Sequence, residues 1–108
     1  MPGNNSKIDL STAKLIVIKI GTRILVDETG KIHYRRLSSL VKQIAQLKQA
    51  GHKVILVSSG AIGAGLKPLG MSLRPQLLPE LQMSASVGQL HLMFHYQRYF
   101  LKQNCVIS

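Results

Sequence analysis

The sequence predicts an α/β fold, with an open, mostly parallel sheet and helices on both of its faces. Two nearly continuous apolar runs are rich in β-branched residues, and helical patterns lie between and after them. Strands that alternate with helices are typical of parallel sheets with right-handed crossovers. The chain has 108 residues, of which 45% are hydrophobic, so we expect one packed domain rather than two.

The first strand is predicted over residues 15–20, near the start of a domain that covers residues 14–108. Residues 1–13 are polar and predict a flexible tail. The strand segment reads LIVIKI and stops at Gly21. Such continuous apolar character is typical of a strand that is buried on both faces of a parallel sheet.

A turn, a helix and the second strand follow. The residue types at 27–30, Asp-Glu-Thr-Gly, are typical of a turn. Over residues 34–50 apolar side chains recur at helical spacing, and the predicted stripe comprises Leu37, Leu40, Val41, Ile44 and Leu47. Gly51 suits the position just beyond the end of this helix. Residues 54–57 form a second apolar run and predict a buried strand.

The rest of the chain predicts two helices, a loop between them and a third strand. A short helix of small residues is expected over residues 61–66, and a loop over residues 71–78. Pro79 suits the first turn of a long helix that ends near residue 102. The residues expected along one side of this helix are Leu81, Ala85, Gly88, Leu92, Tyr96 and Tyr99. Residues 105–108 have the pattern of a strand start.

The chain is strongly basic, which favours polyanionic partners such as nucleic acids, phosphates or acidic lipids. Lys and Arg outnumber Asp and Glu by 14 to 4, for a net charge of +10. The basic residues are scattered, however, and only Arg35 and Arg36 are adjacent. We therefore interpret the charge as a solvated surface and do not expect a nucleic-acid partner. A small basic module that binds phosphate or nucleic acid is the alternative.

Signals for membranes, export and disulfides are missing from the sequence. The strongest apolar runs are far shorter than the roughly 20 residues that a membrane span needs, so no membrane partner is expected. The N-terminal residues lack the apolar core of a signal peptide. Cys105 is the single cysteine and cannot form an internal disulfide. Together these observations predict a cytoplasmic protein.

Lys19 is the first candidate site residue, because it closes the apolar row of the first strand next to Gly21. Ligands of open α/β sheets bind beyond the carboxyl ends of the strands. A lysine at this end can reach a phosphate, and glycine lets the backbone approach a ligand closely. The alternative is a lysine that simply extends into solvent from the strand end.

The second candidate site is the segment Ser58-Ser59-Gly60, which leads from the second strand into the helix that begins at Ala61. Such a turn directs free backbone N–H groups and the positive helix end at one point, and the serine hydroxyl groups add donors. We interpret it as a site for a carboxylate or a phosphate. The alternative is an ordinary serine N-cap, with glycines that allow close helix–strand packing.

Several other kinds of site find no support in the sequence. Gly60 and Gly65 have the spacing of a P-loop, but Leu-Lys follows where Lys-Ser or Lys-Thr is required. The glycine order does not match the dinucleotide-binding fingerprint either. Asp27 and Glu28 are the only acids close together, and they fall in a turn, so paired-carboxylate chemistry is unsupported.

His91 and His95 are four residues apart on the long helix, a spacing that can present two metal ligands. No third ligand is near, and leucine rather than glutamate follows His91, so we predict no metal site. Tyr96, Tyr99 and Phe100 could stack on nucleic-acid bases. At helical spacing we expect them in the core or in an interface instead.

The chain resembles the glutamate 5-kinases, a branch of the amino acid kinase family, over roughly residues 14–108. The segments that carry the resemblance are VIKIGT at 17–22, VSSGAIGAG at 57–65 and LPELQMSASVGQ at 78–89. Aspartate kinases typically have Lys-Phe-Gly-Gly at the first segment, and acetylglutamate kinases have Lys-Tyr-Gly-Gly. The Gly-Thr pair and the two longer segments therefore point to the glutamate 5-kinase branch.

This resemblance implies ATP-dependent phosphorylation of the side-chain carboxylate of L-glutamate, the first step of proline biosynthesis, with Mg²⁺ bound to the ATP. The implied catalytic residue is Lys19, which would contact the transferring phosphate. The implied ATP-binding residues are Lys19, Gly21 and Thr22. The implied glutamate-binding residues are Ser59, Gly60 and Ala61.

Members of that family are more than twice as long and often carry a PUA domain, so we expect this chain to be the N-terminal portion of an amino acid kinase domain. The later Asp and Asn residues that bind glutamate in the family have no counterpart in it. Catalysis is therefore expected only together with the remaining portion, and a non-catalytic remnant is the alternative. Full-length members are expected to be homo-oligomers.

Overall fold

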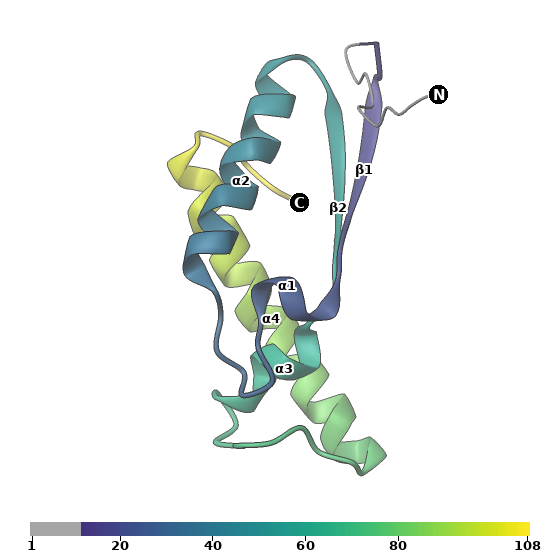
Figure 1. Ribbon diagram of the computed structural model, residues 1–108, viewed down its shortest axis with the longest axis vertical. Helices are drawn as coiled ribbons and strands as arrows, with labels where there is room; N and C mark the ends of the chain where they lie inside the picture. Colours follow the sequence, from purple (N-terminus) through teal and green to yellow (C-terminus); the bar gives the residue numbers. More distant parts are fainter. Residues whose placement is uncertain (1–11) are drawn as a thin grey trace, which may run out of the picture.

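The structure is a computed structural model that describes residues 12–108 (Figure 1). Residues 1–11, which hold most of the predicted tail, lie outside the described residues. The elements in chain order are β1 (Leu15–Ile20), α1 (Thr22–Leu25), α2 (Tyr34–Gln49), β2 (Lys53–Ser58), α3 (Ala61–Leu66) and α4 (Leu78–Lys102). Among the described helices none is both long and apolar enough to pass through a lipid bilayer.

β1 and β2 form a parallel two-stranded sheet, with α2 as the connection between them. The register places Lys19 beside Val57 and Ile20 beside Ser58, so both strands end at the same edge of the sheet. The two predicted strands, their parallel pairing and the α/β class are thereby confirmed.

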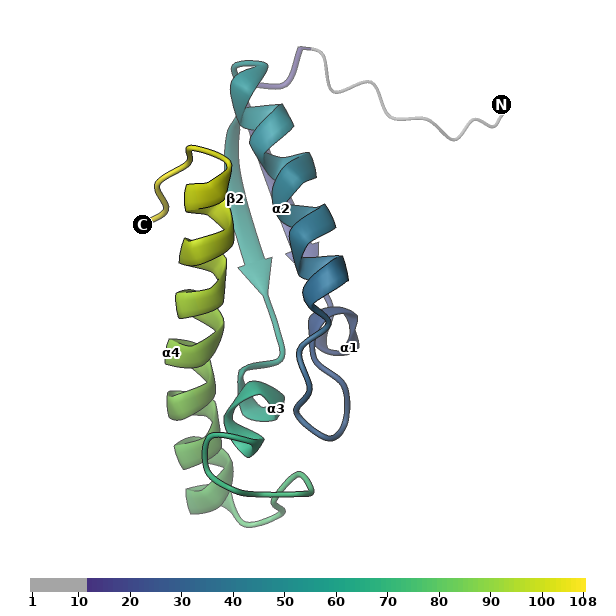
Figure 2. The ribbon, with the colours of Figure 1, turned by 90° about the vertical axis from the view of Figure 1, so that its left-hand side faces the viewer.

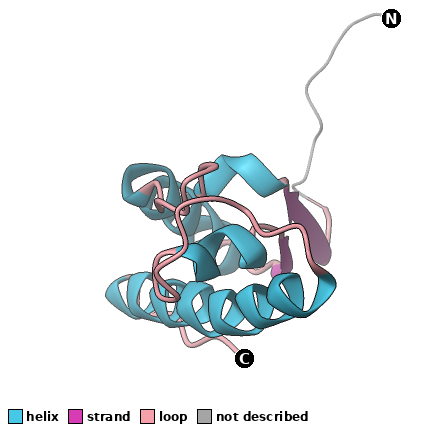
Figure 3. Ribbon diagram, turned by 90° about the horizontal axis from the view of Figure 1, so that it is seen from below, coloured by secondary structure: helices cyan, strands magenta, loops and turns pink. Residues whose placement is uncertain are grey.

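Helices cover one face of this sheet. α2 and α4 lie on the same side of the strands, as both side views and the end-on view show (Figures 1, 2 and 3). The side chains that face these helices are Ile16, Ile18, Ile20, Val54 and Leu56. The apolar side chains of the opposite face are 46–61% exposed, namely Leu15, Val17, Ile55 and Val57. Helices were expected on both faces of the sheet. Within residues 12–108 they cover one face only.

α2 confirms the predicted amphipathic helix. The apolar stripe buries Leu37, Val41, Ile44 and Ala45, whereas Leu40 and Leu47 are only partly buried. Gly51 follows the helix end with a φ of 97°, a left-handed conformation that suits glycine. The His52 N–H donates to the Leu47 carbonyl at 3.2 Å, and the Gly51 N–H donates to the Lys48 carbonyl at 3.0 Å. These two bonds form a Schellman motif, as expected where glycine follows a helix.

α3 and α4 pack against each other with almost no space between their backbones. A Cβ atom placed on Gly88 would collide with the Ala61 carbonyl, and one on Gly65 would collide with the Ser84 carbonyl. The buried Ser84 hydroxyl donates to the Ile62 carbonyl at 2.6 Å. The small residues of both helices are therefore needed for helix–helix contact.

α4 has the predicted extent, and Gly88, Leu92 and Tyr96 of its expected side are buried. The buried positions, four residues apart, are Ser84, Gly88, Leu92, Tyr96 and Phe100. Leu81, Ala85 and Tyr99 are only partly buried. The polar Ser84 was not expected on this side, and it is buried against α3 because its hydroxyl finds a carbonyl partner there.

Two elements differ from the prediction. Thr22–Leu25 forms the short helix α1, which the sequence analysis did not predict. Residues 105–108 were expected to begin a strand, and this was wrong, because no described strand pairs with them. They follow a turn in which the Cys105 N–H donates to the Phe100 carbonyl at 2.9 Å. Cys105 is buried, whereas Val106 is 78% exposed.

Candidate functional site

The two sequence segments that predicted a ligand site lie side by side at the carboxyl edge of the sheet. β1 ends at Ile20 and leads into Gly21, and β2 ends at Ser58 and leads into Ser59. The Ser59 N–H donates to the Ile20 carbonyl at 3.2 Å, which extends the strand pairing by one bond. The structure therefore brings the Lys19 end of β1 and the Ser59 turn together.

Lys19 is an exposed cation on the sheet face that no described helix covers. It shares this face with Leu15 and Val17, as strand alternation requires. Gly21 follows with an ordinary φ of −70°, so its conformation does not demand glycine. A Cβ atom on Gly21 would meet nothing within 4 Å. The backbone beside Lys19 is thus open to a ligand, and Thr22 begins α1 directly after it.

The two serines at the end of β2 have different environments. The Ser58 hydroxyl lies 2.7 Å from the Tyr96 hydroxyl, so this serine is tied to α4. Within residues 12–108 no such partner holds the hydroxyl of the half-buried Ser59. Only Ser59 is therefore free to donate to a ligand. Sequence reasoning placed Tyr96 in the core but did not find its bond to Ser58, because 38 residues separate them.

Burial raises the pKa of the Tyr96 phenol above its ordinary value of 10.0, and the hydrogen bond with Ser58 partly offsets this rise. The phenol therefore stays protonated at neutral pH and can take part in the bond as donor or acceptor. This polar pair lies at the inner side of the candidate site and holds the β2 end in place.

The turn into α3 depends on Gly60. Its φ of 103° is in the left-handed region, where side chains cause strain, and it is the residue that caps α3. No side chain caps this helix, so the alternative of an ordinary serine N-cap is wrong. The glycines that were thought to allow helix–strand packing instead face other elements: Gly65 contacts α4 and Gly63 contacts Val26.

A cavity of about 400 Å³ adjoins this turn. It lies between the segment after β1, α3 and the loop that joins α3 to α4. Its lining residues are Arg23, Val26, Asp27, Glu28, Gly60, Gly63, Leu66, Leu73 and Arg74. This volume is within the range of small-molecule sites, about 300–1,000 Å³. Sequence reasoning did not find the cavity, because three segments distant in the chain form it.

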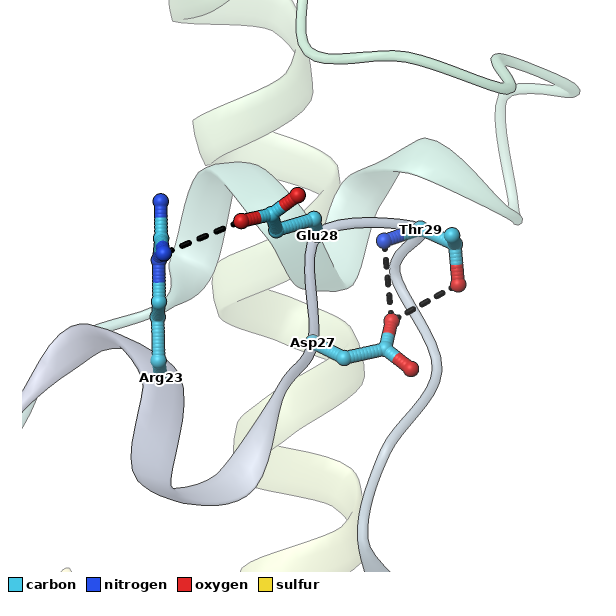
Figure 4. A network of polar contacts seen from close by, with 4 residues as sticks. All are labelled: Arg23, Asp27, Glu28 and Thr29. Atoms are coloured by element: carbon cyan, nitrogen blue, oxygen red, sulfur yellow. Dashed lines mark hydrogen bonds and ion pairs between the residues drawn. The ribbon is translucent and has the colours of Figure 1, made fainter.

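Arg23 and Glu28, which both line this cavity, form an ion pair (Figure 4). The Arg23 guanidinium nitrogen lies 2.9 Å from a Glu28 carboxylate oxygen, and both side chains are about three-quarters exposed, at 76% and 74%. Such an exposed pair contributes little to stability, since water screens it. Its effect is to neutralise two of the four charged side chains that line the cavity.

Asp27 organises the turn that forms one wall of the cavity (Figure 4). Its Oδ1 atom accepts three hydrogen bonds, from the Thr29 hydroxyl at 2.7 Å, the Thr29 N–H at 2.8 Å and the Lys31 N–H at 3.0 Å. The Thr29 hydroxyl above all, and then the Lys31 amide, lower the pKa of Asp27 below its ordinary value of 3.8. The predicted turn over residues 27–30 is confirmed, and its aspartate is an anion at neutral pH.

The histidines of α4 form an aromatic cluster. The His91 and His95 rings meet edge to face with centroids 4.7 Å apart, and Tyr34 meets His95 in the same way at 5.3 Å. Burial, followed by the charges of His91 and Arg98, lowers the pKa of His95 below 6.5. The part of the chain that the structure describes holds no group of three or more His, Cys, Asp or Glu side chains that could bind a metal.

The aromatic side chains at the end of α4 pack against other aromatic side chains. Tyr96 and Phe100 are buried, as expected, with ring centroids 6.4 Å apart. Tyr99 is partly buried and stacks on Tyr34 at 6.5 Å. The contact of Tyr99 with Tyr34 links α4 to α2.

Comparison with known proteins gives consistent matches. Residues 14–108 match the amino acid kinase family. The chain is 48% identical over 98 residues to glutamate 5-kinase 2 of Bacillus subtilis (strain 168), which covers 91% of this chain and 26% of that protein. It is 42% identical over 108 residues to glutamate 5-kinase of Moorella thermoacetica, which covers 100% of this chain and 29% of that protein.

A third relative is glutamate 5-kinase of Clostridium acetobutylicum, 42% identical over 99 residues, which covers 92% of this chain and 37% of that protein. The chain therefore spans between 26% and 37% of the lengths of these three curated relatives.

Proposed function

Because this chain belongs to the amino acid kinase family over residues 14–108, we propose that it carries the phosphate-binding and glutamate-binding turns of a glutamate 5-kinase. The reaction would transfer the γ-phosphoryl group of ATP to the side-chain carboxylate of L-glutamate and form glutamyl 5-phosphate, the first step of proline biosynthesis. The chain spans 26–39% of the lengths of its curated relatives. The complete reaction is therefore part of the proposal.

One observation carries the proposal: the hydrogen bond from the Ser59 N–H to the Ile20 carbonyl joins two turns of different chemistry. The turn after β1 offers the Lys19 cation and an open backbone at Gly21. The turn after β2 offers the free Ser59 hydroxyl and the glycine-dependent backbone of Gly60. Two anions, one bound at each turn, would lie about one strand spacing apart, or about 4.8 Å.

Lys19 is proposed to act on the transferring phosphoryl group. Phosphoryl transfer spreads negative charge over the equatorial oxygens, and catalysis depends on positioning and charge stabilisation more than on covalent help from the protein. An ammonium at the strand end supplies that charge. Gly21 and Thr22 are proposed to line the phosphate path, and the open space around Gly21 supports close approach of phosphate oxygens.

Ser59, Gly60 and Ala61 are proposed to hold the glutamate side-chain carboxylate. The Ser59 hydroxyl and the backbone N–H groups at the start of α3 are donors, and a carboxylate is an acceptor only. A carboxylate oxygen would attack the γ-phosphorus while the bond from that phosphorus to the bridging oxygen breaks and ADP leaves. The carboxylate already carries the electron pair that attacks, so no general base is required.

ATP would supply the phosphoryl group, and Mg²⁺ bound to it would neutralise phosphate charge. The residues present fit the phosphates, because a cation and an open backbone lie together at Lys19 and Gly21. They offer no cluster of carboxylates for the metal within residues 12–108. We therefore propose that the described part of the chain contacts the phosphates of ATP. A cytoplasmic location and homo-oligomeric assembly also remain proposals.

The test is a hydroxamate assay on the 108-residue chain, with glutamate, ATP, Mg²⁺ and hydroxylamine, which traps the acyl phosphate. Any product that the chain forms should be lost in Lys19→Ala and kept in Lys53→Ala, which lies at the other end of the same sheet. Equal turnover in the Lys19 variant would contradict the role of Lys19.

A titration with MgATP, followed by amide chemical shifts, applies even to a chain without turnover. Shifts at Gly21 and Thr22 that Lys19→Ala removes support the phosphate site. A chain that neither turns over nor shifts at these amides contradicts the proposal.

A further inference from the structure

Basic and aromatic side chains meet on the surface where α2 and α4 are in contact. An open groove of about 580 Å³ lies there, and its lining includes Tyr34, Arg35, Ser38, Lys42 and Tyr99. Positions 34, 38 and 42 of α2 are four residues apart, so they lie on one side of that helix. Tyr99 belongs to α4, and the groove therefore crosses from one helix to the other.

Aromatic rings continue from this groove along α4. Tyr34 stacks on Tyr99 with ring centroids 6.5 Å apart, and it meets His95 edge to face at 5.3 Å. The ring of Phe94 meets His95 in turn at 5.7 Å. Tyr34 is 47% exposed and Phe94 is 52% exposed, so both rings offer surface to a partner.

Four exposed cations border these rings. The Lys102 Nζ atom lies 4.9 Å from the centre of the Tyr99 ring, and the Arg98 guanidinium lies 5.5 Å from the centre of the Phe94 ring. Arg35 and Lys42 line the groove itself, and all four basic residues are exposed. We call this set of residues the basic–aromatic face: Tyr34, Arg35, Lys42, Phe94, Arg98, Tyr99 and Lys102.

The positive charge of the basic–aromatic face is not balanced by acids. The acidic residues within residues 12–108 are Asp27, Glu28 and Glu80. None of them forms an ion pair with a cation of this face. Burial, followed by the charges of His91 and Arg98, lowers the pKa of His95, and no acid acts on it in the opposite direction. A surface that disfavours a further positive charge attracts an anion.

A nucleic-acid partner was not expected from the sequence, because the basic residues are scattered along the chain. The fold brings two cations of α2 and two of α4 to one face, with aromatic rings between them. Proteins that bind single-stranded nucleic acid combine these two features, since cations follow the phosphates and bases stack on aromatic rings. Acidic peptides and lipid headgroups use the cations but have no bases that could stack.

We propose that the basic–aromatic face binds single-stranded nucleic acid, with its four cations as partners of the phosphates and Tyr34 as the ring on which a base stacks. An open groove across two helices suits an extended strand, whereas a compact ligand needs a concave pocket. This binding is separate from phosphoryl transfer, because Lys19 and the Ser59 turn lie at the carboxyl edge of the sheet and take no part in the contacts of this face.

The test follows the fluorescence anisotropy of a labelled single-stranded DNA as the 108-residue chain is added at several salt concentrations. A strand of about 12 nucleotides is within the size range of single-strand binding sites. Each phosphate contact contributes about −0.7 to the slope of log K against log salt, so four contacts predict a slope of about −2.8.

Two variants of α2 test the phosphate contacts. Arg35→Gln and Lys42→Gln should each weaken binding and reduce the magnitude of the slope by about 0.7. Lys48→Gln is the matched control, because it removes the same charge from the same helix but lines a different cavity. It should leave the slope unchanged. Circular dichroism shows that each variant is folded.

Two ligands test the role of Tyr34. Inorganic polyphosphate carries the charges of a nucleic-acid backbone but no bases, and its affinity is measured by displacement of the labelled DNA. Tyr34→Ala should weaken the DNA about tenfold, because the stacking of a base is lost, and leave the affinity for polyphosphate unchanged. Tyr34→Phe keeps the ring and should bind both ligands as the unaltered chain does.

Selective loss of DNA binding in Tyr34→Ala, together with the smaller slopes of the Arg35 and Lys42 variants, supports the proposal. Equal weakening by Lys48→Gln would show a diffuse basic surface and overturn it. Weakening of DNA and polyphosphate alike by Tyr34→Ala would contradict the base contact. Vesicles of phosphatidylserine and phosphatidylcholine that bind through Arg35 and Lys42 more tightly than the DNA would identify a membrane as the partner instead. The absence of saturable DNA binding also overturns the proposal, whatever the hydroxamate assay shows.

Discussion

The hydroxyl oxygens of Ser58 and Tyr96 lie 2.7 Å apart and join the last residue of β2 to the middle of α4. Ser58 pairs with Ile20 in the sheet, and the next residue, Ser59, donates to that same isoleucine. α4 in turn packs closely on α3. The Ser59 turn is therefore held on both sides, by the sheet before it and by the two helices after it.

Tyr96→Phe should destabilise the fold by about 1 kcal/mol, because it removes one hydrogen bond. The Ser58 hydroxyl keeps only its 3.3 Å bond to the Ser59 carbonyl. The ring and its packing against Phe100 are retained. Urea unfolding followed by circular dichroism measures the change. Tyr99→Phe is the matched control and should change the free energy of unfolding by less than about 0.5 kcal/mol. Equal effects of the two substitutions would show that the Ser58 bond contributes nothing.

Gly88→Ala should destabilise the protein by about 1–3 kcal/mol, because the new methyl group would collide with the Ala61 carbonyl across the α3–α4 contact. Helix propensity alone predicts the opposite effect, because alanine favours a helix by about 1 kcal/mol over glycine. The sign of the change in stability therefore separates the two effects. Gly21→Ala meets nothing within 4 Å and should leave the melting temperature unchanged. Thermal unfolding compares the two variants. A stabilised Gly88 variant would mean that the helices lie farther apart.

Thr29→Val should raise the pKa of Asp27 toward 3.8, because the Thr29 hydroxyl is the main cause of its lowered value. A lowered pKa in the folded state stabilises the fold above the ordinary value, and that stabilisation is lost as the pH falls through the folded value. The variant should therefore lose less stability in acid than the unaltered chain. A carbon-detected NMR titration of the carboxyl group measures the pKa, with Thr12→Val as the control. An unchanged Asp27 pKa would contradict the assigned cause.

His91→Ala should raise the pKa of His95, because the charge of His91 is one of the causes that lower it, after burial. With a folded-state pKa below 6.5, His95 stabilises the neutral-pH fold, and this contribution is lost as the pH falls below 6.5. The ring-proton shifts of His95 between pH 4 and pH 8, at about half-unit steps, follow its titration. His33→Ala, on the loop before α2, is the control. A His95 pKa that does not respond to His91 would contradict the charge of His91 as a cause of the lowered value.

Much of the fold could be predicted from local patterns. The apolar runs of β1 and β2, the helical spacing of α2 and the glycine at position 51 each depend on neighbours within a few residues. α1 was missed because four residues show no helical period. The strand at 105–108 was wrongly expected because an apolar run becomes a strand only beside another strand, and no described strand lies there. Ser84 was not expected on the buried side of α4, because its place there depends on a carbonyl of α3 that accepts its hydrogen bond.

Part of the candidate site could likewise be predicted from the sequence, and part could not. Lys19 and Ser59 could be found from the sequence, because the ends of parallel strands meet at one edge whatever the details of packing. The separate roles of Ser58 and Ser59 could not, since they depend on Tyr96, which lies 38 residues from Ser58 in the chain. The cavity beside Gly60 could not be found either, because its lining comes from segments that are separated in the chain.

The contact between α3 and α4 also limits which second mutations can restore a variant with a larger residue at position 88. The atoms that face Gly88 are the Ala61 carbonyl and the Gly65 nitrogen, which belong to the backbone and are present whatever side chains stand there. No replacement of a neighbouring side chain removes them. A genetic selection that starts from a larger residue at position 88 should therefore yield true revertants to glycine rather than second-site suppressors.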